Sequence, residues 1–393
     1  MTGSEIPYRN YEPSLLEQVY PQRNQRLEEL AVLLASKAGQ LTRGLHPIVL
    51  RSLGTLVRSM NCYYSNLIEG HRTRPIDIER ALAQDFSSDP EQRNLQQEAK
   101  AHIEVQTLLD LDPNWQTLDV VSPEFIQQLH REFYQRLPEA FWQLGEVAVR
   151  PGEWRSANVQ IGRHIPPPPD ALPAFLARFA RVYSPDRLSG VDRILAAAAA
   201  HHRFVWIHPF LDGNGRVVRL FSHAYFQRIG IGNSLWSVSR GLARKMQDYR
   251  SLLAQADLQR LNDYDGRGNL TMAGLVEFCE FFLETCIDQI DFMTELLEPT
   301  QLLNRIEANV AISVQQRSLL PGSFALLKAA FLEGEIARGR AAQIAGYRER
   351  QARSVLKRLI ERGLLVADSP KGAVRLGFPT MAVEQWFPRL WAE

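Results

Sequence analysis

The chain has 393 residues, and its 45 lysines and arginines nearly balance its 44 aspartates and glutamates, which leaves a formal charge of +1. This balance excludes a polycation or polyanion, so the net charge alone indicates no nucleic-acid or membrane-surface partner. The composition, 45% hydrophobic and 23% charged, is typical of a globular protein. Because one hydrophobic core rarely organises so long a chain, we expect at least two domains.

Nothing in the sequence predicts membrane insertion or secretion. The longest purely apolar run, residues 194–200, is far shorter than the ~20 residues that a bilayer span needs. Residues 1–10 are polar and contain no apolar stretch of the kind found in a signal peptide. Cys62, Cys279 and Cys286 form no C-x-x-C pair, which excludes a cysteine zinc site and favours a reducing compartment. We therefore expect a cytoplasmic protein with no membrane partner.

Apolar side chains recur with a period near 3.6 along most of the chain, which predicts a mainly α-helical protein. We expect a first helical segment over residues 1–110. Within it, Ser65 and Glu69 are four residues apart and share one helix face, while Gly70 suits the left-handed turn that follows a helix end. By themselves these three residues indicate only the end of a helix.

A second helical domain is expected over residues 111–290, with one interruption. Between residues 147 and 169, glycines and prolines break any helix, while Val159 and Ile161 alternate around Gln160. This pattern predicts a small β-hairpin with an extended exit.

The strongest signal in the chain is the stretch of residues 208–219, which reads HPFLDGNGRVVR. Gly213 and Gly215, on either side of Asn214, let successive backbone N–H groups converge where a new helix begins. Such a glycine turn at a helix N-terminus is an anion site.

Charged side chains around this turn agree with an anion. Arg216 and Arg219 share a helix face at the end where the helix dipole is already positive, so a bound polyphosphate would relieve their repulsion. Asp212 offers the hard oxygen ligand that Mg²⁺ takes beside phosphates. His208, with an ordinary pKa near 6.5, stands at the edge of the loop as a candidate base.

This stretch resembles the signature of the Fic family, His-Pro-Phe-x-(Asp or Glu)-Gly-Asn-Gly-Arg-x-x-Arg, and matches each of its fixed positions. The resemblance implies a helical domain that binds ATP with Mg²⁺ and transfers AMP to a Ser, Thr or Tyr hydroxyl of a target protein. It makes His208 the base that deprotonates the hydroxyl and Asp212 the metal ligand. The phosphates would be held by Gly213, Asn214, Gly215, Arg216 and Arg219.

Two flanking segments extend the resemblance to roughly residues 65–286. Val159, Gln160 and Ile161 lie where the family has a flap, which covers the site and docks a target segment by strand addition. Tyr249 resembles the start of the helix that lines the family's adenine pocket. An asparagine of that pocket has no counterpart nearby, which leaves the base of the nucleotide open.

Ser65, Glu69 and Gly70 match the family's inhibitory motif, (Ser or Thr)-x-x-x-Glu-(Gly or Asn). The resemblance implies that Glu69 pairs with Arg219 and displaces the γ-phosphate, which would make the protein a self-inhibited adenylyltransferase. A glutamate near the α-phosphate could instead orient water, so a de-adenylylating or bifunctional enzyme is the alternative. Self-modification and homodimer formation are also left open.

A helical linker over residues 291–319 and a separate domain over 320–393 complete the expected organisation. The domain has three helical stretches followed by a hairpin, an order that resembles a winged helix: residues 323–333, 338–345 and 348–362, then 364–367 paired with 373–376. It carries 12 basic and 7 acidic residues, a net charge of +5. The third stretch presents Arg350, Arg353 and Lys357, so a DNA-binding regulator with a nucleotide-sensing Fic module is a rival interpretation. We favour a domain that recruits protein.

Overall fold

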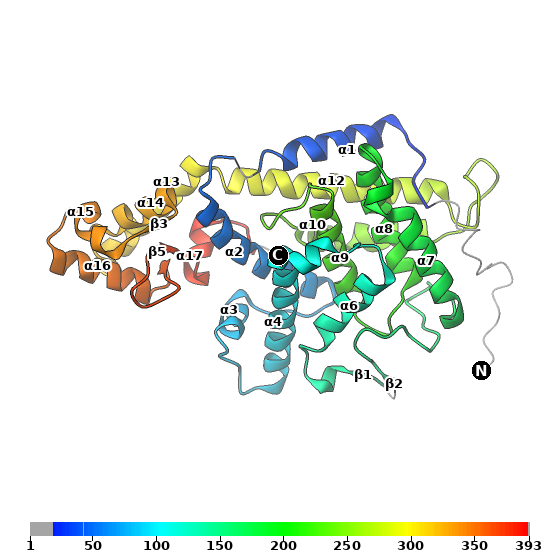
Figure 1. Cartoon of the computed structure of the whole chain (residues 1–393), viewed down its shortest axis with the longest axis horizontal. Coiled ribbons are helices and arrows are strands. Elements are labelled where there is room, and N and C mark those ends of the chain that lie inside the picture. The colour runs from blue at the N-terminus through cyan, green and yellow to red at the C-terminus, as the bar shows by residue number, and fades with distance from the viewer. Residues whose placement is uncertain (1–18, 42, 146, 392–393) are drawn as a thin grey trace.

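The computed structural model describes residues 19–41, 43–145 and 147–391, and the polar residues 1–10 lie outside this part of the chain. Helices dominate it, as predicted, with only short strands between them (Figure 1). None of the helices in these residues combines the length and the apolar character that crossing a bilayer would require.

Twelve α-helices form the main body of the described chain. They are α1 (Gln25–Ala38), α2 (Pro47–Ile68), α3 (Pro75–Leu82), α4 (Pro90–Leu111), α5 (Pro113–Thr117), α6 (Pro123–Tyr134), α7 (Leu172–Tyr183), α8 (Val191–Ile207), α9 (Asn214–Arg228), α10 (Val238–Arg244), α11 (Met246–Ala256) and α12 (Met272–Leu296). Short 3₁₀ turns lie at Glu139–Phe141, Pro169–Ala171 and Pro185–Arg187.

Helix α9 lies at the centre of this body and contacts α8, α6, α10, α2 and α4. Residues 196–200 of α8 are a run of buried alanines, and their small side chains let α8 pack closely against its neighbours. Helix α1 lies along α12 on the outside of the body (Figure 1). Most of the signature helix is therefore buried, and its partly or fully exposed positions lie at its two ends, at Gly215 in the first turn and at Gln227 and Arg228 in the last.

The interruption between α6 and α7 differs in detail from the predicted hairpin. Strands β1 (Gln143–Leu144) and β2 (Val147–Ala148) form an antiparallel pair, of which β2 lies at the start of the expected range and β1 just before it. Within the expected range, Ile161 and His164 form only an isolated bridge. Part of the segment is bonded to the signature loop, since the Arg155 N–H donates to the Pro209 carbonyl over 2.9 Å.

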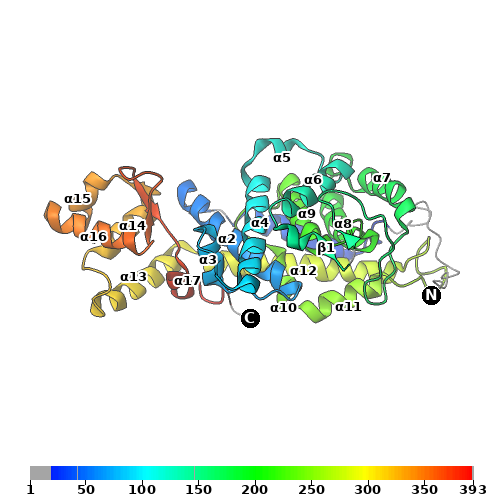
Figure 2. The same cartoon turned by 90° about the horizontal axis from the view of Figure 1, so that it is seen from below.

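The C-terminal part lies at one end of the molecule (Figures 1 and 2). It contains α13 (Pro299–Gln315), α14 (Ser323–Glu333), α15 (Ala341–Ala345) after a 3₁₀ turn at Arg338–Arg340, and α16 (Glu349–Glu361). Its antiparallel sheet has the order β3-β5-β4, from β3 (Glu335–Ile336), β4 (Leu365–Val366) and β5 (Val374–Leu376). The predicted helices and final hairpin are present, while the winged-helix assignment itself stays a prediction. Helix α12 continues past residue 290, so the expected linker begins inside it.

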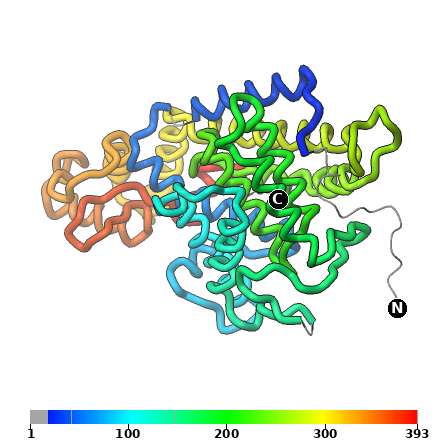
Figure 3. Tube along the Cα trace, turned by 45° about the vertical axis from the view of Figure 1, so that its right-hand side comes forward, coloured from blue at the N-terminus to red at the C-terminus, as the bar shows by residue number. Residues whose placement is uncertain are grey.

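The last described segment, residues 379–391, leaves this part and returns to the body; we call it the C-terminal tail. It contains α17 (Thr380–Trp386), and in Figure 3 its red trace runs back among the helices of the body. The Tyr64 hydroxyl of α2 donates to the Leu390 carbonyl over 3.0 Å, and Trp391 meets the ring of Tyr63 edge-on. The C-terminal tail therefore supports α2, the helix that carries the candidate inhibitory residues.

Candidate nucleotide-binding site

The signature loop is shaped by two backbone reversals. Helix α8 ends at His208, which adopts the left-handed conformation (φ 48°) before Pro209, a residue that cannot continue a helix. Gly213 (φ 79°) reverses the chain again and starts α9. Between them, Asn214 Oδ1 accepts from the Phe210 N–H over 3.0 Å and its Nδ2 donates to the Phe210 carbonyl over 2.8 Å. The Asn214 side chain thus stabilises the loop by these two hydrogen bonds. Its backbone N–H, and not its side chain, lies at the start of α9.

The ring of His208 is hydrogen-bonded and buried in a way that favours its neutral form. Its Nδ1 donates to the Val205 carbonyl over 3.3 Å, which leaves Nε2 to accept a proton. Burial lowers the pKa of His208 to about 4, so the imidazole is neutral near pH 7. Arg155 Nε holds the loop from outside, donating to the His208 carbonyl over 2.8 Å.

Asp212 is oriented by two neighbouring helices. The Tyr134 hydroxyl of α6 donates to Asp212 Oδ2 over 2.6 Å, and Nη2 of Arg216 lies 3.3 Å from the same oxygen. His130 Nδ1 accepts from the Gly152 N–H, so its Nε2 donates to the Asp212 carbonyl over 3.3 Å. Burial raises the pKa of Asp212, but Arg216 and Tyr134 outweigh it and keep the carboxyl ionised.

The Asp212 carboxylate is a ligand of the type that Mg²⁺ prefers. No group of three or more His, Cys, Asp or Glu side chains able to hold a metal occurs among the described residues. The Asp212 side chain is 43% exposed beside the glycine turn. A single exposed carboxylate suits a Mg²⁺ ion that takes its remaining ligands from phosphates and water.

Arg219 is enclosed by the inhibitory motif. Its Nη2 lies 2.6 Å from Glu69 Oε1 and 3.0 Å from the Ser65 carbonyl, and its Nε donates to Ser65 Oγ over 2.9 Å. Burial raises the pKa of Glu69, but the charges of Arg219 and Arg216 lower it overall. The ion pair implied by the resemblance is therefore present, with Gly70 (φ 89°) in the left-handed turn that follows.

The Glu69 carboxylate also lies directly over the first turn of α9. A Cβ atom built on Gly215 would stand only 3.2 Å from Glu69 Cδ and 3.2 Å from Nη1 of Arg219. Only glycine leaves room at this point for an anionic group to approach the helix N-terminus. Glu69 thus occupies the position that the sequence predicts for a phosphate.

Arg216 has a partner that the sequence did not reveal. Its Nη1 forms a close ion pair with Oε1 of Glu98, a fully buried carboxylate on α4. Glu98 raises the pKa of Arg216 despite the opposing effect of burial. One signal could have indicated this role, because Glu98 shares a helical stripe with the buried Val105 and Leu109. A carboxylate on an apolar stripe requires a charged partner.

Tyr249 is buried, and its hydroxyl lies 2.8 Å from His201 Nε2. His201 in turn lies 2.7 Å from Ser222 Oγ through its Nδ1. This chain of contacts ties α11 to α8 and α9. A place for Tyr249 in an adenine pocket stays a prediction.

The predicted flap residues lie on an exposed extended segment. Gln160 and Ile161 are exposed and Val159 is half-buried. His164 Nε2, just after them, donates to the Trp206 carbonyl over 2.8 Å. The segment is therefore anchored to the end of α8, the helix whose last turn leads into His208.

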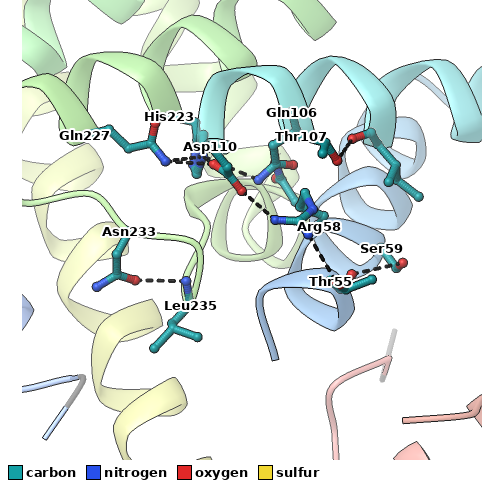
Figure 4. Close-up of polar contacts among 12 residues, drawn as sticks. Thr55, Arg58, Ser59, Gln106, Thr107, Asp110, His223, Gln227, Asn233 and Leu235 are labelled. Carbon is teal, nitrogen blue, oxygen red and sulfur yellow. Dashed lines mark hydrogen bonds and ion pairs between the residues drawn. The ribbon is translucent and has the colours of Figure 1, made fainter. Parts of the chain in front are cut away.

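Behind the site, a buried polar network joins α2, α4 and α9. Figure 4 shows Asp110 of α4 between His223 and Gln227 of α9 on one side and Arg58 of α2 on the other. The distances from Asp110 are 2.7 Å to His223 Nε2, 2.9 Å to Arg58 Nη1 and 2.7 Å to Gln227 Nε2. Burial opposes ionisation of Asp110, but His223 and Arg58 lower its pKa to about 2. The network fixes α2, which carries the candidate inhibitory residues, relative to α9.

Comparison with known proteins agrees with this site. Residues 120–226 match the Fic/DOC family. A protein named "Protein adenylyltransferase Fic" from Drosophila erecta is 40% identical over 82 residues, which are 21% of this chain and 17% of that protein. The protein of the same name from Drosophila melanogaster is 35% identical over 116 residues, 29% of this chain and 21% of its own length. The chain spans about a fifth of the length of these curated relatives.

Solved structures share the fold over a longer stretch. A Fic family protein from Desulfovibrio desulfuricans covers 90% of this chain and 97% of its own, with a TM-score of 0.53 and 19% identity. Fic-1 from C. elegans covers 70% of this chain and 73% of its own, with a TM-score of 0.54 and 16% identity. The signature loop lies within residues 120–226, the part of the chain that is similar to the Fic/DOC family.

Proposed function

We propose that this protein is a self-inhibited protein adenylyltransferase, which moves AMP from Mg-ATP to a Ser, Thr or Tyr hydroxyl of a target protein. The observation that carries the proposal is the N-terminal turn of α9, where Arg216 and Arg219 both act on Glu69 and where Glu69 takes an anion's position. The curated relatives, which match 21% and 29% of this chain, bear the name of this activity.

The chemistry needs few protein groups. His208 Nε2 takes the proton of the target hydroxyl, whose oxygen attacks the α-phosphorus of ATP. The bond from that phosphorus to the oxygen bridging to the β-phosphorus breaks, and pyrophosphate leaves with the electron pair. Arg216, Arg219 and the N–H groups of the glycine turn hold the phosphates in line for this attack, which is where most of the acceleration arises. Asp212 would hold Mg²⁺, which would neutralise charge on the phosphates.

Self-inhibition follows from the competition for Arg219. A triphosphate in the productive pose needs this guanidinium for its outer phosphates, but Glu69 and Ser65 already satisfy it. ATP can then bind only with its phosphates displaced, and the attack geometry is lost. Movement of the turn at Gly70 would restore activity.

The remaining parts of the proposal concern partners and location. Strand addition at the exposed flap would present the target hydroxyl to His208. The C-terminal domain is proposed to recruit protein, because two basic side chains of α16, Arg353 and Lys357, already pair with Glu349 and Glu361. All three cysteines are free and buried, which supports a reducing, cytoplasmic location.

The direct test is transfer of labelled AMP. Wild type, Glu69→Gly, and Glu69→Gly combined with His208→Ala are incubated with Mg²⁺, a candidate target extract and ATP labelled at either the α- or the γ-phosphate. We expect only α-label to reach protein, strongly with Glu69→Gly, weakly with wild type and not with the double variant. Transfer of γ-label would indicate a kinase. Undiminished α-label transfer without His208 would contradict the mechanism, and no transfer by Glu69→Gly would contradict the proposed function.

A further inference from the structure

The buried carboxylate of Glu98 joins two parts of the site that are far apart in the sequence. Its Oε1 pairs with Arg216 of the signature helix, and its Oε2 lies 2.6 Å from Nδ1 of His71. His71 is the residue directly after Gly70, and its own N–H donates to the Asn66 carbonyl of α2 over 2.9 Å. One carboxylate on α4 therefore holds both a phosphate-binding arginine and the exit of the inhibitory turn.

Glu69 and Glu98 differ in how easily their side chains can move away from the phosphate site. The Glu69 side chain is 31% exposed and sits at a helix end. The Glu98 side chain is fully buried in the middle of α4, whereas that of His71 is 39% exposed. A nucleotide can displace Glu69 by moving the turn, but Glu98 cannot follow it out of the interior. The contact between Glu98 and His71 is thus one that must break when the inhibitory turn opens.

We propose that Glu98 is a positioning residue that holds Arg216 at the phosphate site and, through protonated His71, locks the inhibitory turn closed, so that self-inhibition weakens as pH rises. The inference rests on the proposed function of the site. Charged groups face His71 from three elements: Glu98 on α4, Arg216 on α9 and Glu69 at the end of α2. The carboxylates favour the imidazolium and Arg216 opposes it.

The direction of the pH effect follows from this balance. The hydrogen bond to Glu98 raises the pKa of His71 above its ordinary value, and burial and Arg216 reduce but do not cancel the rise. The closed turn therefore binds the proton more tightly than the open turn does. Its extra stability is fully present below about pH 6.5 and is lost as pH rises through the raised pKa. A neutral imidazole still donates one hydrogen bond, but a weaker one than the imidazolium does.

The activity test uses labelling by each variant as a fraction of labelling by Glu69→Gly at the same pH, which removes effects of pH on the chemistry itself. Between about pH 6 and pH 9 we expect this fraction to rise about fivefold for wild type, because a charge-assisted hydrogen bond is stronger than a neutral one by about 1 kcal/mol. His71→Lys keeps a permanent charge and should stay quiet across the range. His71→Leu has no donor and should label more than wild type at every pH. The matched control is Arg72→Gln, which removes a charge from the adjacent exposed position and should behave as wild type.

A second measurement does not depend on activity. Titration of the His71 ring by NMR should give a raised pKa in wild type and a lower pKa in Glu98→Gln, which weakens the hydrogen bond that raises it. If His71 titrates identically in both, or if His71→Leu is as quiet as wild type while Glu69→Gly labels strongly, the inference is wrong and the proposed function stands. If Glu69→Gly itself does not label, the proposed function fails and the inference fails with it, even where the titration shows the contact.

Discussion

Glu69 Oε1 lies 2.6 Å from Nη2 of Arg219, although the two residues are 150 positions apart in the chain. The guanidinium is almost fully buried, and Ser65 takes two more of its donors. Because the arginine is satisfied without phosphate, the site is stable in its closed form. The charge that a productive nucleotide needs is therefore already neutralised by the protein.

This pairing predicts a pattern across three variants. Glu69→Gly should label strongly, Arg219→Ala should stay quiet, and the double variant should be quiet again, because Arg219 serves both inhibition and phosphate binding. Glu69→Gly should lower the free energy of unfolding by less than about 2 kcal/mol, since Ser65 still satisfies the arginine. Labelling with α-labelled ATP and chemical denaturation measure the two effects. An active double variant would show that Arg219 does not hold the phosphates.

The uninhibited enzyme should tolerate mild acid. Burial lowers the pKa of His208 to about 4. The imidazole can accept a proton only when the pH lies above its pKa, so this base stays in its neutral form well below pH 7. The initial labelling rate of Glu69→Gly should not fall through loss of this base between about pH 8 and pH 6. A rate that halves near pH 6.5 would mean that His208 titrates normally.

ATP should stabilise the fold through Arg216. A ligand that binds only the folded state stabilises it by RT ln(1 + [L]/Kd), so ATP with Mg²⁺ should raise the melting temperature of Glu69→Gly. Arg216→Ala in that background should reduce the shift, because a phosphate contact at the positive end of α9 is lost. Arg228→Ala, at the exposed far end of the same helix, is the control and should retain the full shift. An equal shift in both variants would argue against a phosphate role for Arg216.

The C-terminal domain should not bind duplex DNA tightly at physiological salt. Arg353 pairs with Glu349 over 2.8 Å and Lys357 with Glu361 over 3.6 Å, so these charges on α16 are partly neutralised within the helix. Fluorescence anisotropy with a labelled duplex should show weak binding that is lost as salt increases. Sequence-selective binding that disappears when Arg350, Arg353 and Lys357 are changed to alanine would reverse this conclusion.

The network behind the site should be costly to disturb. Asp110→Asn leaves Arg58 without its buried counter-ion and weakens the hydrogen bond to His223, and we expect a loss of about 3 to 5 kcal/mol in the free energy of unfolding. Asp186→Asn, which breaks an exposed pair with Arg228, should cost at most about 1 kcal/mol. Asp110 keeps its charge in the folded state down to about pH 2, so its contribution should be lost as pH falls from about 4 toward 2. A loss as small as that of the control would contradict the role of the network.

The signature loop could be predicted because its chemistry is local, whereas the Glu69–Arg219 pair joins residues 150 positions apart. Glycines, arginines and a carboxylate recur at fixed short spacings within each motif, and the pairing followed from the family resemblance. The partner of Arg216 could not be found in this way, because Glu98 lies 118 positions away on a helix with no motif of its own. Likewise, Val159 and Ile161 alternate with a polar residue as in a strand, yet their segment is bonded to the signature loop through the Arg155 N–H and the Pro209 carbonyl. Tertiary contacts decide such short extended segments more than local propensity does.

The contact between Tyr64 and Leu390 spans 326 positions, so it bears on the order in which the molecule can assemble. During synthesis, every residue of the signature loop and of the inhibitory motif is made well before the C-terminal tail. The packing of helix α2 is therefore incomplete until residues 389–391 have been synthesised. Contacts of such long sequence separation also form slowly. A nascent chain thus holds a nearly finished site whose inhibitory helix still lacks its last support.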